Sequence, residues 1–134
     1  MTTKEHLQQA YRLARGIRLK RKRILELREF AGKSTSAITT DRVSGTSVQS
    51  RMEHCIVQID EWEREVDEAV GTQKKVISII RGVKNLDQRD VMELRYIDGL
   101  TWDEVVDRLY MSRRKVFYLH GEALKSCIVL HQKM

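Results

Sequence analysis

The chain of 134 residues contains no proline, and it has only seven glycines and two cysteines. Because proline breaks helices and glycine weakens them, their scarcity favours long helices over strands and tight turns. No stretch approaches the roughly 20 consecutive apolar residues of a membrane span, and the polar, basic N-terminus has no apolar signal-peptide core. We therefore expect an all-α protein of the cytoplasm that does not contact a membrane.

The residues that carry most enzyme chemistry are also sparse. Cys55 and Cys127 have no CxxC partner, so we expect both thiols to be reduced and packed in the core. The four histidines lack metal-ligand spacing, and no phosphate-binding loop, dinucleotide fingerprint or nucleophile elbow occurs. The carboxylates between Asp60 and Glu68 are typical of a helix face. These absences predict a protein with no metal, no cofactor and no enzymatic activity.

Positive charge is unevenly distributed along the chain. The whole chain has a net charge of +6, but residues 1–33 carry +7, residues 34–82 carry −2 and residues 83–134 carry +1. The basic excess lies mainly between Arg12 and Arg23, with a smaller focus at Arg113-Arg114-Lys115. Such foci attract the phosphate backbone of nucleic acids or anionic surfaces, and a solvated helix segment is the alternative interpretation of the first one.

The N-terminal part of the chain predicts two long amphipathic helices joined by a linker. Apolar residues recur every three or four positions in residues 4–30, and again in residues 49–82, where a heptad-like seam predicts the longest helix of the chain. The Ser-, Thr- and Gly-rich stretch 31–50 has no periodicity and predicts a flexible linker. One helix has a basic centre and the other an acidic one, which favours an antiparallel, coiled-coil-like hairpin in residues 1–82. Because a helical pair buries little surface alone, we expect this domain to form a homodimer or a higher homo-oligomer.

The sequence of residues 83–134 predicts a second domain, made of three helices, the last of which is long for a recognition helix. We expect these helices at residues 85–98, 102–109 and 112 to about 131. The first would begin at Asn85 or Asp87 and end at Gly99, with Leu86, Val91, Leu94 and Ile97 facing inward. Thr101 and Glu104 have the spacing of a capping box, and Ser112 is a suitable N-cap for the last helix. Trp62 and Trp102 are predicted to be anchors of the core.

Two helices joined by a tight turn, the second opening with three basic residues, are the sequence form of a helix-turn-helix. The second helix of this motif enters the major groove of DNA, where an arginine that bridges guanine O6 and N7 gives about 1–3 kcal/mol of base discrimination. With Val116 and Leu119 buried, the predicted DNA-binding residues are Arg113, Arg114, Lys115, Phe117 and Tyr118. The predicted phosphate contacts are Ser112, Thr101, Arg18, Lys20, Arg21, Lys22 and Arg23.

Two parts of the sequence resemble known families. The stretch Leu94-Arg-Tyr-Ile-Asp-Gly-Leu-Thr-Trp-Asp-Glu-Val-Val-Asp-Arg-Leu109, followed by a helix that opens at Ser112, resembles region 4 of bacterial sigma factors. The N-terminal residues 3–13 and the phrase Leu119-His-Gly-Glu-Ala-Leu124 are similar to the ArpU/RinA type of late transcriptional regulators, from phages and integrated elements of Gram-positive bacteria. The resemblance implies a regulator in the cytoplasm of a bacterial host cell that binds double-stranded promoter DNA, with contact to RNA polymerase as a further expectation. It also implies that Arg113, Arg114, Phe117 and Tyr118 read the bases.

The sequence departs from the sigma pattern at Tyr110, where the turn usually has glycine. A positive φ at this tyrosine would cost about 1 kcal/mol or more. Gly121 stands in the middle of the last helix, where it would permit close approach of another helix or backbone. Two other functions stay open: a DNA-packaging adaptor of the small-terminase kind, and a protein-interaction module that binds host RNA polymerase without reading DNA. A ring of many subunits would favour packaging, and failure to bind DNA would favour the interaction module.

Overall fold

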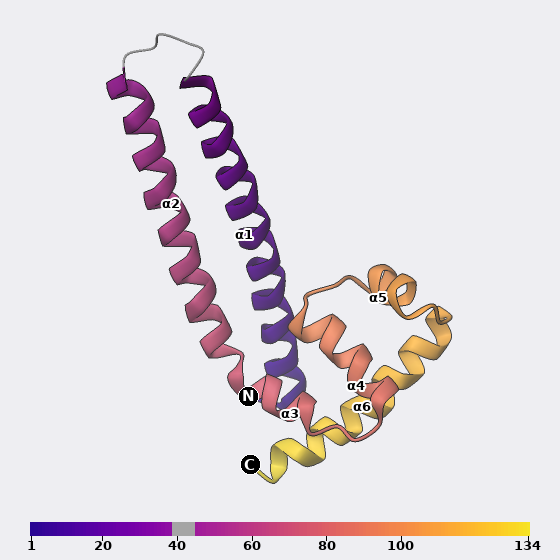
Figure 1. The fold of residues 1–134 in the computed structure, drawn as a ribbon. Coiled ribbons are helices and arrows are strands. Elements are labelled where there is room, and N and C mark those ends of the chain that lie inside the picture. Colours follow the sequence, from indigo (N-terminus) through magenta and orange to yellow (C-terminus); the bar gives the residue numbers. More distant parts are fainter. Residues whose placement is uncertain (39–44) are drawn as a thin grey trace. The chain divides into compact units, whose positions relative to one another are not determined.

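The structure, a computed structural model, describes residues 1–38 and 45–134, with side chains for residues 1–32 and 49–134. Within these ranges every regular element is a helix, which confirms the predicted all-α fold (Figure 1). No helix in the described ranges has the length and apolar character needed to cross a membrane. The elements are α1 (Thr3–Ile38), α2 (Gly45–Thr72), α3 (Lys74–Arg81), α4 (Leu86–Met92), a π-helical turn η1 (Glu93–Ile97), α5 (Trp102–Leu109) and α6 (Arg113–Gln132).

The chain forms two compact units, which share the two long helices. The core unit consists of residues 1–18 and 69–134, and the hairpin unit consists of residues 19–68. The division therefore differs from the domain boundary between residues 82 and 83 that we expected from the sequence. The first turns of α1 and the whole of α3 belong with the C-terminal helices, because they share one apolar core with them.

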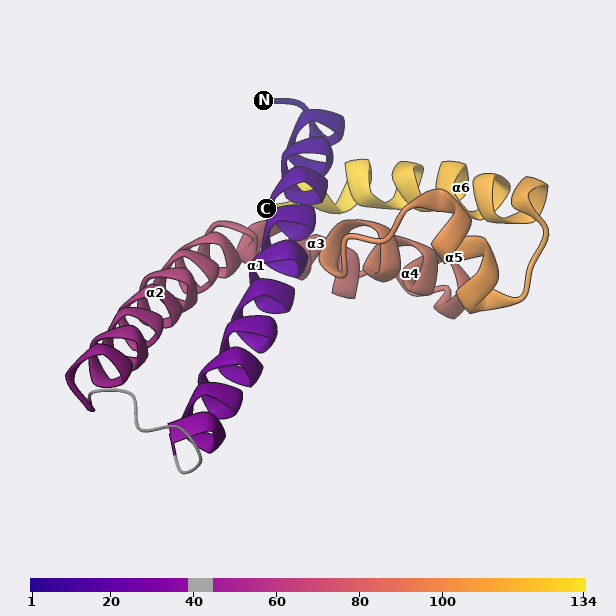
Figure 2. The same cartoon turned by 90° about the horizontal axis from the view of Figure 1, so that it is seen from above.

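Two apolar clusters lie inside the core unit. The first joins the start of α1 to α3, α4, η1 and α6, and its buried members are Leu7, Ala10, Val76, Ile79, Ile80, Val83, Met92, Tyr96, Ala123 and Cys127. The second lies between α4, α5 and α6, and its buried members are Val91, Leu100, Val105, Val116 and Leu119. Figure 2 shows α4, α5 and α6 as neighbours in this unit. Helix α6 contributes to both clusters, so its inner face is fixed along much of its length.

The two long helices extend further than the sequence predicted. Helix α1 continues to Ile38 instead of ending near residue 30, and α2 begins at Gly45, so most of the predicted linker 31–50 is helical. Only residues 39–44 lie outside the described residues. The composition misled the prediction, because serine, threonine and glycine each cost under about 1 kcal/mol in a helix, whereas proline, which would forbid one, is absent.

The predicted helix 49–82 is broken in the structure. Helix α2 ends at Thr72 and α3 begins at Lys74, so α1, with 36 residues, and not this segment, is the longest helix. The break coincides with Gln73, whose buried side chain donates a hydrogen bond from Nε2 to the carbonyl oxygen of Ala10 at 2.8 Å. Gly71 and Thr72 are weak helix formers directly before it. A buried polar contact to α1 therefore interrupts an otherwise continuous apolar pattern.

The predicted helix 85–98 is also corrected in detail. Asn85 caps α4 as expected, accepting from the amide of Gln88 at 3.0 Å, but Leu86 is exposed rather than inward. Val91 is buried, and Leu94 and Ile97 are half-buried side chains packed against the apolar clusters, as predicted, while Tyr96 is buried as well. The π-helical turn η1 accounts for the burial of Tyr96, because its wider turn shifts the register of its side chains relative to a regular helix.

Gly99 ends this segment with φ +72°, as a C-terminal glycine was expected to. A Cβ at this position would lie 2.8 Å from the carbonyl carbon of Ala14 and 2.9 Å from the amide nitrogen of Arg15. The turn before α5 therefore rests directly on the backbone of α1, and both conformation and space require glycine there.

Candidate nucleic-acid interface

Helices α5 and α6 begin at the caps that the sequence predicted. Thr101 and Glu104 form the capping box of α5: the threonine hydroxyl accepts from the Glu104 amide at 3.3 Å, and the Glu104 carboxylate accepts from the Thr101 amide at 3.1 Å. Ser112 caps α6 and accepts from the amide of Lys115 at 3.2 Å. Tyr110 adopts the left-handed conformation with φ 54° and ψ 39°, as its place in the turn suggested. Local side-chain chemistry thus defines both ends of the turn.

The first turns of α6 have a buried side and an exposed, basic side. Val116 and Leu119 are buried in the second apolar cluster, as predicted. The predicted base-reading residues all lie on the exposed side, and two of them are aromatic: 41% of Phe117 and 67% of Tyr118 is accessible. Arg113, Arg114 and Lys115 are exposed beside them. The structure therefore brings the five predicted DNA-binding residues together at one end of one helix.

The three basic residues of this surface are not equivalent. Arg113 forms an ion pair with Asp103 of α5, and both side chains are more than half exposed. Such an exposed pair is worth under about 1 kcal/mol, so it orients Arg113 without holding it firmly. Within the described part of the chain, no ion pair engages Arg114 or Lys115. Arg114 and Lys115 are therefore the cations of α6 with charge free to meet a ligand.

A group of aromatic side chains supports α6 from behind. Trp102, at the start of α5, lies 5.0 Å from the ring of Phe117 and 4.7 Å from the ring of His120. The hydroxyl of Tyr96 is hydrogen-bonded to His120 Nε2 at 2.7 Å. Burial lowers the pKa of His120 to about 4 and raises the pKa of Tyr96 to about 12, so at neutral pH both rings are uncharged. Trp102 is half-buried against the second cluster and anchors the unit, as predicted.

Arg95 connects this aromatic group to α1. Its guanidinium carbon lies 3.6 Å from the ring centroid of Tyr11 and 4.5 Å from that of Trp102, and its Nη1 donates to the carbonyl oxygen of Leu100 at 3.2 Å. Cation–π contacts of this kind contribute about 0.5–2 kcal/mol each. Sequence reasoning missed the roles of Arg95 and Tyr96, because the π-helical turn places them on a face that a regular helix would not show. A signal for His120 was present in the sequence, because it follows Val116 by four residues and therefore lies on the same inner face of α6.

The predicted phosphate contacts fall into two groups. In the core unit, Thr101 is occupied by its capping box, and Arg18 binds both carboxylate oxygens of Glu104, at 2.8 and 2.5 Å. The Arg18 guanidinium, helped by the Thr101 amide, lowers the pKa of Glu104 to about 2. Arg18 therefore ties α1 to the start of α5, a structural role that the sequence did not suggest.

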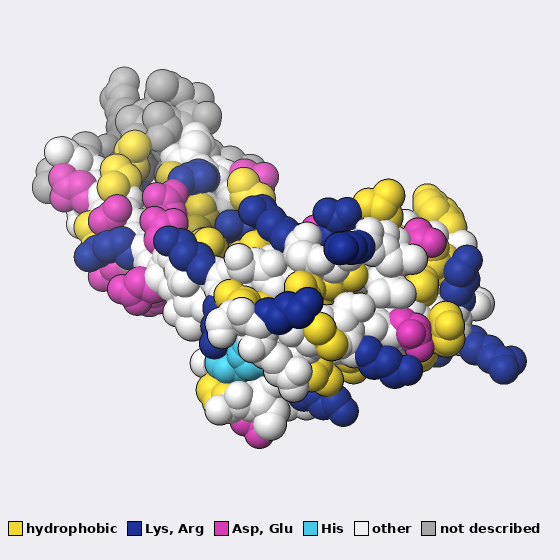
Figure 3. Space-filling model, turned by 90° about the horizontal axis from the view of Figure 1, so that it is seen from below, with side chains coloured by type: hydrophobic (Ala, Val, Ile, Leu, Met, Phe, Trp, Pro, Cys, Tyr) yellow, Lys and Arg dark blue, Asp and Glu magenta, His cyan; other side chains and the backbone are white. Residues whose placement is uncertain are grey.

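The other group lies in the hairpin unit. Lys20 forms an ion pair with Glu65 at 2.5 Å, whereas Arg21, Lys22 and Arg23 are exposed and form no ion pair within the described residues. On the face drawn in Figure 3, acidic side chains gather over the hairpin unit beside the grey residues, while Lys and Arg side chains are spread among apolar ones elsewhere. The three consecutive basic residues of α1 remain available to a ligand.

Neither cysteine forms a disulfide, and both are buried, which confirms the prediction for Cys55 and Cys127. In the described ranges, no group of three His, Cys, Asp or Glu side chains is arranged to hold a metal ion.

Comparison with known proteins places the chain in a family. The family described as "Protein of unknown function (DUF1492)" matches residues 33–127, most of the chain, so the protein belongs to that family. No curated protein and no solved structure matched the chain.

Proposed function

We propose that this member of the DUF1492 family is a DNA-binding transcriptional regulator, and that the start of α6 reads the major groove of double-stranded DNA. The observation that carries the proposal is the cluster of exposed basic and aromatic side chains on the first turns of α6, directly after a tight, capped turn from α5. This is the arrangement of a recognition helix.

The start of α6 has two features that suit a nucleic acid. The first is its charge: Arg113, Arg114 and Lys115 are consecutive, so they surround the helix end and can reach both phosphates and base edges. The second is the helix N-terminus, where Ser112 satisfies only the amide of Lys115 and leaves the preceding amides to bind a phosphate. Among these groups Arg114 is best suited to a bidentate contact with guanine, since Arg113 must first leave Asp103.

The exposed aromatic pair suits DNA as well. Tyr118 can donate to a phosphate oxygen, and the edge of Phe117 can contact a thymine methyl group. The exposed cations Lys22 and Arg23 would add affinity that is independent of sequence. The finer assignment to a phage or mobile-element regulator rests on the resemblance of residues 3–13 and 119–124 to the ArpU/RinA type. Contact with RNA polymerase rests on the resemblance of residues 94–109 to sigma region 4.

The test compares wild type with the double variant Arg113→Ala/Arg114→Ala. DNA fragments that the wild type retains are first selected from a bacterial or phage genome, and affinity is then measured by fluorescence anisotropy at several salt concentrations. We expect the double variant to lose about 10- to 100-fold in affinity for the selected fragments and most of its preference over random DNA.

A matched control removes two arginines from α2 instead, as Arg51→Ala/Arg64→Ala. This variant has the same net charge, so it reports the purely electrostatic loss, which should be small and equal for all sequences. The proposal is wrong if wild type binds no DNA, or if the α6 variant behaves like the α2 control.

A further inference from the structure

Where its side chains are described, at residues 19–32 and 49–68, the hairpin unit has a small core and a large exposed apolar surface. Of the twenty buried apolar residues in the described chain, only Ile24, Cys55 and Val66 belong to it. Five of the twelve exposed large apolar residues belong to it as well: Leu19, Leu25, Phe30, Ile56 and Val57. Two helices that bury so few apolar side chains between them are not held together by the hydrophobic effect alone. This surface therefore needs a partner.

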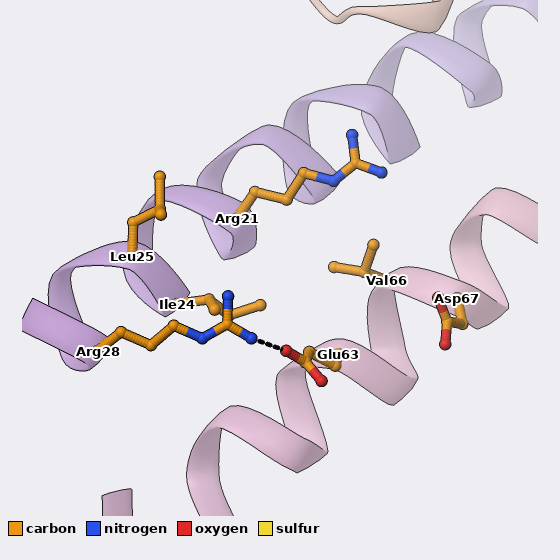
Figure 4. A pocket seen from close by; sticks show the side chains of 7 residues that line it. All are labelled: Arg21, Ile24, Leu25, Arg28, Glu63, Val66 and Asp67. Atoms are coloured by element: carbon orange, nitrogen blue, oxygen red, sulfur yellow. Dashed lines mark hydrogen bonds and ion pairs between the residues drawn. The ribbon is translucent and has the colours of Figure 1, made fainter. Parts of the chain in front are cut away.

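Three of these exposed apolar residues, Leu25, Ile56 and Val57, line a groove that runs along one side of α1 and α2. Two adjoining cavities share Arg28 and Glu63, and together they extend from Arg21 and Asp67 to Ala31 and Cys55. Figure 4 shows Ile24 and Val66 pointing toward each other across the gap between the helices, while Leu25 points away from α2. Leu25 is 60% exposed and Ile56 is 62% exposed, one from each helix. The groove thus has apolar side chains in its floor and on both flanks.

The charges at the groove have opposite signs on its two sides. Helix α1 contributes Arg21 and Arg28, and α2 contributes Glu63 and Asp67. Arg28 is paired with Glu63 within the chain (Figure 4), but neither Arg21 nor Asp67 forms an ion pair in the described ranges. A ligand that satisfies both must itself be acidic where it meets α1 and basic where it meets α2. A second copy of the same groove has this pattern.

We propose that the groove of the hairpin unit binds the same groove of a second copy, forming a four-helix bundle in which α1 of each chain packs against α2 of the other. Face-to-face packing about a twofold axis allows two arrangements. With the axis perpendicular to the helices, α1 faces α1 and like charges oppose each other, which costs free energy. With the axis along the helices, α1 faces α2, and Arg21 of each copy meets Asp67 of the other. Charge selects the second arrangement.

This arrangement has a consequence for the rest of the chain. Residues 19 and 68 lie at the end of the hairpin unit away from the C-terminus of α1 and the N-terminus of α2 (Figure 1). With the twofold axis along the helices, all four of these chain ends emerge at the same end of the bundle. The inference does not rest on DNA binding, and its test is carried out without DNA.

The test uses charge reversal and sedimentation equilibrium of the full chain. We expect wild type to be a dimer at about 100 µM, a concentration at which even weak specific pairs form. Arg21→Glu and Asp67→Arg should each weaken dimerisation by about tenfold or more, since each homodimer then has two like-charge contacts. An equimolar mixture of the two variants should restore the dimer, because both contacts of the mixed pair join opposite charges.

The controls separate this interface from a general loss of folding. Leu19→Glu adds charge at a half-exposed position of α1 outside the groove and should leave dimerisation unchanged, whereas Leu25→Glu should weaken it strongly. Circular dichroism of each variant checks that the helices are retained. A monomeric wild type would overturn the proposal and leave the groove to another partner. Failure of the mixture to recover, or equal effects of the Leu19 and Leu25 variants, would also overturn it.

Discussion

Every regular element of the core unit and of the hairpin unit is a helix where the units are described, but the two are stabilised in different ways. The core unit has two apolar clusters, three side-chain helix caps and buried hydrogen bonds such as that from Gln73 to Ala10. The hairpin unit relies on ion pairs between its helices, Lys20 with Glu65 and Arg28 with Glu63, whose side chains are about one-third to one-half exposed. Exposed ion pairs contribute at most about 1 kcal/mol each, whereas a buried aliphatic side chain contributes about 1.5–3 kcal/mol.

The difference teaches that helical content and tertiary stability are separate properties. A long helix of good propensity forms its own hydrogen bonds, yet it stays marginal until an apolar face is covered. In the core unit the chain itself covers that face. In the hairpin unit the cover is incomplete, which is why we infer a second copy there and a self-sufficient fold in the core unit.

The largest expected effect compares one isoleucine from each unit. Ile80→Ala removes a fully buried side chain from the first cluster and should lower the free energy of unfolding by about 3–4 kcal/mol. Ile56→Ala truncates an exposed side chain. It should change the free energy of unfolding by under about 0.5 kcal/mol at concentrations where the protein is monomeric. Urea unfolding measures both. Equal losses of unfolding free energy in the two variants would contradict the inferred difference in packing between the units.

The next effect concerns the contact of the Gly99 turn with α1. Gly99→Ala adds a Cβ that meets the backbone of Ala14 and Arg15 at a positive φ, so we expect a loss of about 2–3 kcal/mol. Gly121→Ala is the matched control. Apart from its chain neighbours and the backbone of its own helix, no atom of the described chain lies within 4 Å of a Cβ there, so the expected approach of another segment is not made by the described residues. This variant should gain about 0.5–1 kcal/mol from helix propensity, and a loss at Gly121 instead would reveal a contact made by a partner.

A smaller effect depends on pH and on His120. Its pKa is about 4 in the folded chain, below the ordinary value of 6.5, because the ring is buried near Arg95. The unfolded chain therefore binds a proton first, and the stability contributed by the neutral ring is lost as pH falls from about 6.5 to 4. Allowing for partial exposure of the ring, we expect a loss of about 1–2 kcal/mol. Urea unfolding at several pH values measures it.

His6 also has a lowered pKa, through burial and the nearby charges of Lys75 and His131, so its contribution to stability is likewise lost as pH falls below its ordinary value of 6.5. The variant His120→Asn isolates the contribution of His120. The difference between wild type and variant should shrink as pH falls from about 6.5 to 4. A difference that is independent of pH would show that the folded-state pKa of His120 is not depressed.

The sequence predicted α5, α6 and their caps well, because Thr101, Glu104 and Ser112 act within one turn of their own helix. The break at Gln73 and the register change in η1 were not predictable in the same way. Each depends on a partner far along the chain: Gln73 needs the carbonyl of Ala10, and Tyr96 needs His120. Among the candidate site residues, exposure on α6 followed from periodicity, but the engagement of Arg18 by Glu104, 86 positions away, did not.

The smallest effect concerns Tyr110, the one non-glycine residue of the described chain with a positive φ. Tyr110 is 95% exposed and left-handed, so its side chain gains nothing from packing while its backbone costs about 1–2 kcal/mol. Tyr110→Gly removes that cost but adds about 0.5–1 kcal/mol of backbone entropy, which leaves a net gain of about 0.5 kcal/mol. Tyr118→Gly, at an exposed position inside α6, should instead lose about 0.5 kcal/mol. Opposite signs in thermal unfolding would show that the turn tolerates strain for the sake of the α5–α6 geometry, and a loss at both positions would show that Tyr110 makes a stabilising contact.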